Sequence, residues 1–111
     1  MSNPNSVSNP NPITAEYIGK YSVIRGRGFG VFAGTVEAVE GDCVKLVNAR
    51  RLWYWDGAAS ISQIAAEGVK SPNGCKFSVP VESIVLRDWI EVIPCTDQAA
   101  TIIQGVKEWK R

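Results

Sequence analysis

The sequence predicts an α+β domain, with an antiparallel sheet of about five strands and two short helices. Segments rich in β-branched and aromatic residues are separated by glycine-containing turns, which is typical of an antiparallel meander. Two later segments place their apolar residues three and four positions apart, which is the period of a helix. The length of 111 residues leaves room for one domain.

The first three expected strands follow one another through tight turns. They span residues 17–25, 29–39 and 43–54. Gly30 and Gly34 lie inside the second strand, and interior glycines indicate a bulge or a close approach by another backbone or a ligand. We expect the meander to bury a single apolar face, formed by Val23, Val31, Val36, Val44 and Leu46.

A short helix is expected over residues 61–67. Ser60 and Gln63 have the spacing of a capping box, and Gly68 is the residue type favoured just past a helix end. Residues 76–77 together with 81–87 suggest a fourth strand, and residues 89–93 a fifth.

A second helix is expected to open at Thr96, with Asp97 in its first turn. Its apolar residues fall on one stripe, at Ala99, Ile102, Ile103 and Val106. Residues 1–13 are mostly Asn, Ser and Pro, so we expect a flexible lead-in followed by one α+β domain over residues 14–111. A domain this small often gains stability by pairing with copies of itself, so we expect self-association.

Composition excludes several classes of function. The net charge of +1 argues against binding of bulk nucleic acid, which needs a basic surplus. Histidine is absent, and with it the usual neutral-pH acid–base group and the commonest metal ligand. The three cysteines form no C-x-x-C pair. We therefore expect no enzyme activity, no metal site and no cofactor, and we expect no signal peptide or membrane span.

The segment over residues 48–60, NARRLWYWDGAAS, carries the densest group of candidate binding residues. Alternate side chains of a strand share a face, so Arg51, Trp53 and Trp55 should point one way and Arg50 the other. A guanidinium beside two indoles suits a nucleotide, by phosphate pairing and base stacking. Asn48 lies in the same segment, and free N–H groups at the helix start at Ser60 attract anions.

Each of these residues also has a structural interpretation. Trp and Tyr on a strand often belong to a core or a subunit interface, and Arg often stacks on Trp simply to cover it. Phe77 beside Lys76 is a second stacking candidate or a core residue. In the tail, Lys107 and Arg111 are either a solvated end or part of a positive ring around a symmetry axis, where a second anionic ligand could bind.

Residues 27–32, RGFGVF, resemble the first RNA-recognition signature of RRM domains. Val31 stands where the second stacking aromatic should be, and the segment lies too early in the chain. A glycine-rich hairpin is the better interpretation, and nucleic acid is an unlikely partner.

From residue 48 to residue 81, the order NARRLWYWDGAASISQIAAEGVKSPNGCKFSVPV resembles a family of small phage and prophage proteins. The likeness extends to the early GVFAG stretch and to the tail. Within that group the chain is most similar to the Thoeris anti-defence sponge family. The resemblance implies a viral protein that sequesters cyclic ADP-ribose signals of bacterial TIR enzymes, and in some members cyclic oligonucleotides of CBASS immunity, in the cytoplasm of the infected host.

The resemblance further implies symmetric oligomers, dimers built into hexamers, that release their ligand uncleaved. Arg50, Arg51 and Phe77 have the residue types for phosphate pairing and adenine stacking in such a pocket. Two alternatives stay open: a phage structural or protein–protein interaction module with an aromatic interface, and a single-stranded nucleic-acid binder that uses the glycine-rich hairpin.

Overall fold

The computed structural model describes residues 12–111 and confirms the α+β class. Its sheet has six strands within this range, not about five. In chain order the elements are α2 (Pro12–Ala15), β1 (Tyr21–Gly26), β2 (Gly30–Glu40), β3 (Cys43–Tyr54), α3 (Ile61–Glu67), the 3-10 turn η1 (Pro72–Gly74), β4 (Lys76–Phe77), β5 (Val81–Arg87), β6 (Trp89–Pro94) and α4 (Asp97–Gly105). Most of the expected lead-in lies outside the described residues, and its last two residues begin α2.

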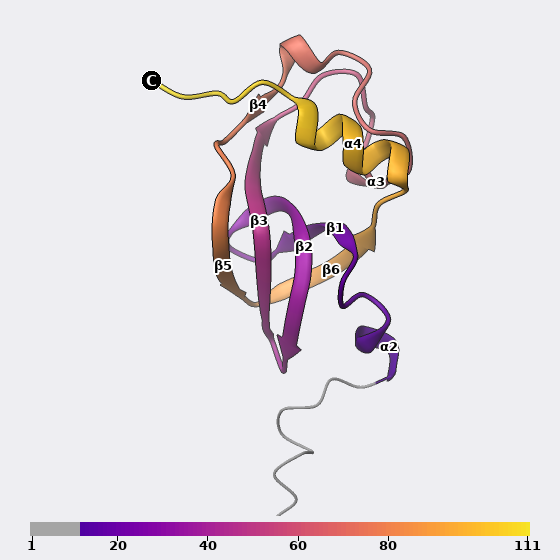
Figure 1. The fold of residues 1–111 in the computed structure, drawn as a ribbon, viewed down its shortest axis with the longest axis vertical. Coiled ribbons are helices and arrows are strands. Elements are labelled where there is room, and N and C mark those ends of the chain that lie inside the picture. Colours follow the sequence, from indigo (N-terminus) through magenta and orange to yellow (C-terminus); the bar gives the residue numbers. More distant parts are fainter. Residues whose placement is uncertain (1–11) are drawn as a thin grey trace, which may run out of the picture.

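The sheet is strongly curled (Figure 1), and the strands at its two edges, β5 and β6, do not pair with each other. β5 pairs with β3 and β6 pairs with β1, with β2 between β1 and β3, yet Asp88 alone separates β5 from β6. The Asp88 N–H donates to the Asp42 carbonyl at 2.9 Å, and the Asp88 carbonyl accepts from the Arg27 N–H at 3.0 Å. Asp88 therefore links the turns at the two ends of β2, and β1, β2, β3, β5 and β6 form a partly open barrel around a shared core.

β2 can curl this far because its ladder with β3 is interrupted twice, between Ala33 and Thr35 and between Val36 and Ala38. The sequence-based expectation of a bulge at Gly34 is confirmed. A Cβ atom on Gly34 would lie 3.0 Å from the Ala49 Cα on β3, so the two backbones approach there as only glycine allows.

The core has two parts, and this corrects the expectation of a single apolar face. Val36, Val44 and Leu46 lie inside the barrel with Ile24 and Phe32. On its other side the sheet packs against α3 and α4, and that cluster includes Val23, Ala33, Leu52, Ile64 and Ile103, with Val31 packed against it. Adjacent residues of a strand point to opposite faces, so Val23 and Ile24 enter different clusters. The meander is thus buried on both faces.

Both helices begin as the sequence predicts. The Ser60 hydroxyl accepts a hydrogen bond from the Gln63 N–H, and Gln63 Oε1 accepts from the Ala59 N–H. Thr96 caps α4 by accepting from the Ala99 N–H at 3.0 Å, and its own hydroxyl donates to the Ala66 carbonyl of α3 at 2.9 Å. One threonine therefore ties the two helices together.

Two expectations about the strands were wrong. The first strand begins at Tyr21, not at residue 17, because residues 17–20 form turns and Gly19 has a φ of 88°. The expected fourth strand is two strands, β4 and β5, which pair with successive parts of β3. Pro80 lies between them, and proline has no N–H to donate to a ladder. Within residues 12–111, none of the helices is long and apolar enough to cross a membrane.

Candidate functional site

An open groove of about 680 Å³ lies between the β1–β2 hairpin and the end of β3. The hairpin contributes residues 28–31, and β3 and the residue after it contribute Arg51, Leu52, Trp53 and Trp55. Arg51, Trp53 and Trp55 therefore line the same groove, as expected from the alternation of side chains along a strand. The glycine-rich hairpin, expected from residues 26–30, forms its other wall.

The Arg51 guanidinium is held at this groove by two aromatic rings and a backbone carbonyl. Its carbon lies 4.3 Å from the centre of the Phe32 ring and 4.9 Å from that of Trp53, so the cation stacks on both rings. Its Nη1 donates to the Phe29 carbonyl. Among residues 12–111 no carboxylate pairs with Arg51. The remaining N–H groups of a positioned, half-buried cation are therefore open to an anion.

The indoles beside Arg51 are accessible. Trp53 is 60% exposed, and Trp55 is half-buried. Across the groove Gly30 has a φ of 84°, and a Cβ there would lie 3.8 Å from Arg51 Nη1. The left-handed backbone at Gly30 favours glycine and keeps this wall free of a side chain.

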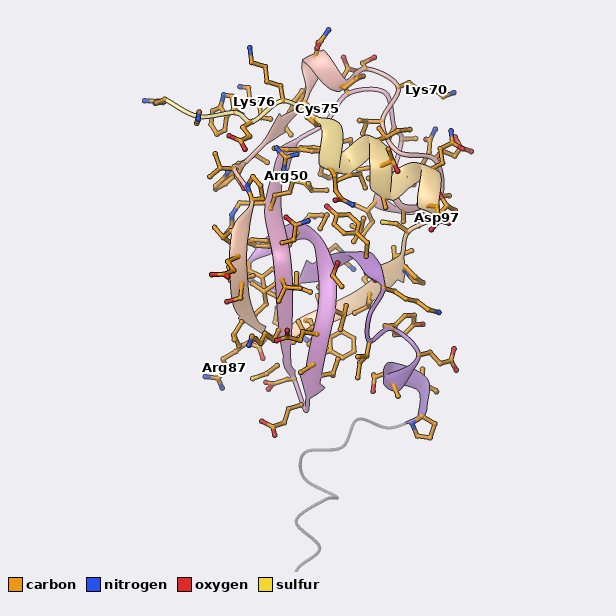
Figure 2. The ribbon with its side chains drawn as sticks, viewed as in Figure 1. Arg50, Lys70, Cys75, Lys76, Arg87 and Asp97 are labelled. Atoms are coloured by element: carbon orange, nitrogen blue, oxygen red, sulfur yellow. The ribbon has the colours of Figure 1, made fainter. Side chains whose placement is uncertain are left out.

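Arg50 lies on the face of β3 opposite to Arg51, as strand alternation predicts, and so it is not part of the groove. It is 3% exposed, and Figure 2 shows its side chain between β3 and α4. Its guanidinium donates to four backbone carbonyls, those of Phe77, Ser78, Ile103 and Val106, at 2.8–3.2 Å. Two of these acceptors belong to the C-terminal end of α4, where a cation is favoured. Burial lowers the pKa of Arg50. These four hydrogen bonds connect β3 to the end of α4 and to β4 with the residue after it.

Asn48 lies near Arg50 rather than at the groove. It has a φ of 51°, and its amide donates to Gln104 Oε1 at 3.5 Å. Together with Tyr21, Arg50 and Pro80, these two amides line a small cavity of about 90 Å³. Asn48 belongs to the same candidate segment as the indoles, but the structure places it at a different hollow.

Phe77 is a core residue, which is the second of the two interpretations that the sequence left open for it. Its side chain is fully buried, and Arg50 lies over its ring at 5.6 Å. The neighbouring Lys76 points the other way and is exposed, with its ammonium 5.5 Å from the centre of the Trp109 ring. Strand alternation separates these adjacent residues, as it separates Arg50 from Arg51.

The tail runs over β4 after it leaves α4 (Figure 1). Glu108 forms a parallel bridge with Phe77, and the Trp109 N–H donates to the Phe77 carbonyl at 2.9 Å. Lys107 lines a hollow of about 230 Å³ with Trp109 and Lys110, and Arg111 is exposed at the end of the chain. These tail cations lie apart from the groove in the single chain.

Ser60 does not line the groove either. Its hydroxyl is used by the cap of α3, and the Ala59 N–H is taken by Gln63. The Ser60 side chain is thus used to cap α3, and the helix start lies outside the groove lining.

A family model described as a domain of unknown function, DUF6948, matches residues 19–103. The chain belongs to this family. The match includes β1 to β6 and most of α4, and so contains the whole groove of the DUF6948 domain, whereas the tail cations lie beyond it. No curated protein matches the chain.

Phe29 is the aromatic lining residue of the DUF6948 domain that sequence reasoning missed, and Gly28, Val31 and Leu52 were missed as well. Phe29 is half-buried, and its ring lies edge-on to Phe32, with centroids 5.9 Å apart. The available signal was Gly30, which marked the segment as a place of close approach. The groove combines a cation with aromatic side chains, and its eight lining residues include no carboxylate, thiol or other group suited to acid–base chemistry.

Proposed function

We propose that this protein binds and sequesters a cyclic nucleotide signal, a cyclic ADP-ribose isomer or a cyclic oligonucleotide, without cleaving it. In this proposal it is a phage immune-evasion protein that acts as a symmetric oligomer in the cytoplasm of the infected bacterial host. The resemblance of residues 48–81 to the Thoeris anti-defence sponge family suggests the ligand class, and the groove offers the chemistry that such a ligand needs.

The observation that carries the proposal is the position of Arg51. Its guanidinium is stacked on Phe32 and Trp53 at an open groove, with no carboxylate partner among residues 12–111. A phosphate could accept from its remaining N–H groups, and an adenine could stack on Trp53 or Trp55. A guanidinium that is already held in place loses little further side-chain entropy when the ligand binds.

Retention of the ligand fits the absence of acid–base groups from the groove lining. The groove is open on one side, and small-molecule sites usually bury most of their ligand. A second copy of the chain that covers the open side would supply the missing enclosure, which is why the proposal includes a symmetric oligomer.

The decisive experiment titrates the purified protein with cyclic ADP-ribose isomers and with cyclic oligonucleotides in a calorimeter. The loaded protein is then heated, and the released ligand is identified by mass spectrometry. We expect intact ligand, and about 10- to 100-fold weaker binding by Arg51→Met, because a hydrogen bond to a charged group is lost. Arg87→Met removes an exposed arginine outside the groove lining and should bind as the wild type does.

Three results would contradict the proposal. Failure to bind any of these ligands, together with a single oligomeric state, would favour an interaction module. A hydrolysed product would indicate an enzyme. Binding of single-stranded nucleic acid with a steep salt dependence would favour the glycine-rich hairpin as a nucleic-acid site. In the same titration Arg111→Glu tests the tail: if every nucleotide affinity is unchanged, the tail binds no second anionic ligand.

One observation favours the interaction module as a second candidate function. Trp53 and Tyr54 are 60% and 55% exposed, and with Trp55 they line a shallow hollow of about 280 Å³. Exposed aromatic clusters are typical of protein interfaces. If this candidate is correct, Tyr54→Ser should change the oligomeric state in analytical ultracentrifugation, whereas nucleotides should have no effect on it.

A further inference from the structure

Arg50 is a buried cation whose charge is only partly balanced. It is 3% exposed and forms no ion pair with a carboxylate among the described residues. The negative charge of Glu108 stabilises the Arg50 cation from a distance, but the Glu108 carboxylate itself forms an ion pair with Lys110 at 3.5 Å. The carbonyl end of α4 offsets about half an elementary charge, so a positive remainder is left at the guanidinium.

Next to this cation lies the cavity of about 90 Å³ lined by Tyr21, Asn48, Arg50, Pro80 and Gln104. The volume exceeds what a single water molecule needs, which is about 10–15 Å³ on this type of measure. Asn48 and Gln104 are exposed, whereas Arg50 is buried, so the cavity opens to solvent beside the two amides and ends at the guanidinium.

The hydroxyl of Tyr21 strengthens the case for a ligand. Its oxygen is buried and has no hydrogen-bond partner among residues 12–111. Burial raises the pKa of Tyr21 far above its usual range, so at neutral pH the group is a hydroxyl that can donate. Buried polar atoms normally have partners, and an unpaired one in a native structure calls for an explanation.

The donors around this cavity outnumber the acceptors. Arg50 has five N–H groups, of which four are used by carbonyls, which leaves one on Nη2. Asn48 and Gln104 contribute amide N–H groups beyond the one bond between them. Guanidinium, phenol and amide donors around one small space match the several acceptor oxygens of an oxyanion.

We propose that the cavity between β1, β3 and the end of α4 is a binding site for a small oxyanion group, such as a phosphate or a carboxylate. This site is separate from the groove, because Arg50 and Arg51 lie on opposite faces of β3, and it does not rest on the proposed function. The oxyanion accepts from Arg50 and Tyr21 at the inner end of the cavity and from the two amides at its mouth.

The site is tested by calorimetric titration of the full chain with inorganic phosphate, acetate and glycerol 3-phosphate, at constant ionic strength. Gln104→Glu places a carboxylate at the cavity mouth and should weaken binding at least about ten-fold. The matched control is Gln98→Glu, which makes the same change of charge at an exposed position in the first turn of α4. It should leave the affinity unchanged.

Tyr21→Phe keeps the aromatic packing and removes only the hydroxyl, so it should also weaken binding. The three ligands distinguish the sources of the oxyanion: preference for inorganic phosphate indicates a free ion, and preference for glycerol 3-phosphate indicates a group carried by a larger molecule. The proposal is overturned if none of the three binds, or if Gln104→Glu and Gln98→Glu weaken binding equally. Neither result affects the groove proposal, because Gln104 does not line the groove.

Discussion

Arg50 and Arg51 are neighbours on β3, but their guanidinium groups have opposite surroundings. Arg50 is inside the protein with four carbonyl acceptors, and Arg51 is at an open groove with one carbonyl and two aromatic rings. The difference follows from strand geometry, which sends adjacent side chains to opposite faces of the sheet. The same alternation makes Arg50 suited to stabilising the fold and leaves Arg51 suited to binding a ligand.

At the residue scale we expect Arg50→Met to destabilise the fold by at least about 3 kcal/mol, because four buried carbonyls lose a charged donor. Urea unfolding followed by circular dichroism measures the change. Arg87→Met, at an exposed position on β5, should cost within about 0.5 kcal/mol of zero. An equally small loss for Arg50→Met would show that solvent replaces the guanidinium and that the site is not buried.

At the scale of elements, the curl of the partly open barrel depends on the single residue between β5 and β6. Asp88 has a φ of 61°, a left-handed conformation that residues other than glycine rarely adopt. Its backbone also bonds to both hairpin turns of β2. The bend at Asp88 therefore allows one continuous stretch of chain to pair with β3 and then with β1.

We expect Asp88→Val to destabilise the protein by about 1–2 kcal/mol, because a β-branched side chain is strained in the left-handed region. Asp88→Gly should be neutral or stabilising, since glycine adopts this conformation freely. Thermal unfolding of the three proteins under identical conditions gives the comparison. If Asp88→Val melts at the same temperature as the wild type, the backbone at residue 88 is not constrained in the way described.

At the scale of the whole molecule, two clusters of buried side chains share one sheet, and the cluster that faces the helices contacts two residues that ionise at high pH. Burial raises the pKa of the Cys95 thiol to about 11 from 9.0. It also raises the pKa of Tyr21 far above 10.0, with the neighbouring Cys95 as the second cause. Both groups lie on the side of the sheet that faces the helices.

A raised pKa means that the folded state holds the proton more tightly than the unfolded chain does. We therefore expect full stability below about pH 9 and a progressive loss between about pH 9 and pH 11 as Cys95 ionises first in the unfolded chain, with Tyr21 adding to the loss above about pH 10. Urea midpoints measured from pH 7 to pH 11 test this. The double variant Cys95→Ala, Tyr21→Phe should show a shallower decline, and an identical decline would contradict the assignment.

The sequence by itself determined the α+β class, β3 and α3 to the residue, and the caps of both helices. Those features depend on local chemistry: glycine and proline at turns, hydroxyl groups at helix starts, and the period of apolar residues. It also placed Arg51, Trp53 and Trp55 on one face, because alternation along a strand is a local rule.

Only the tertiary structure decided which face of β3 is buried against α4 and which borders the groove. That choice made Arg50 and Phe77 internal and moved Asn48 away from the indoles. It also brought the β1–β2 hairpin against the end of β3, so that Phe29 and Gly30 line the groove. β6 pairs with β1 and β5 pairs with β3, which brings together residues that are far apart in the chain. Local sequence patterns do not predict such long-range contacts, because the contacts depend on how the whole sheet curls.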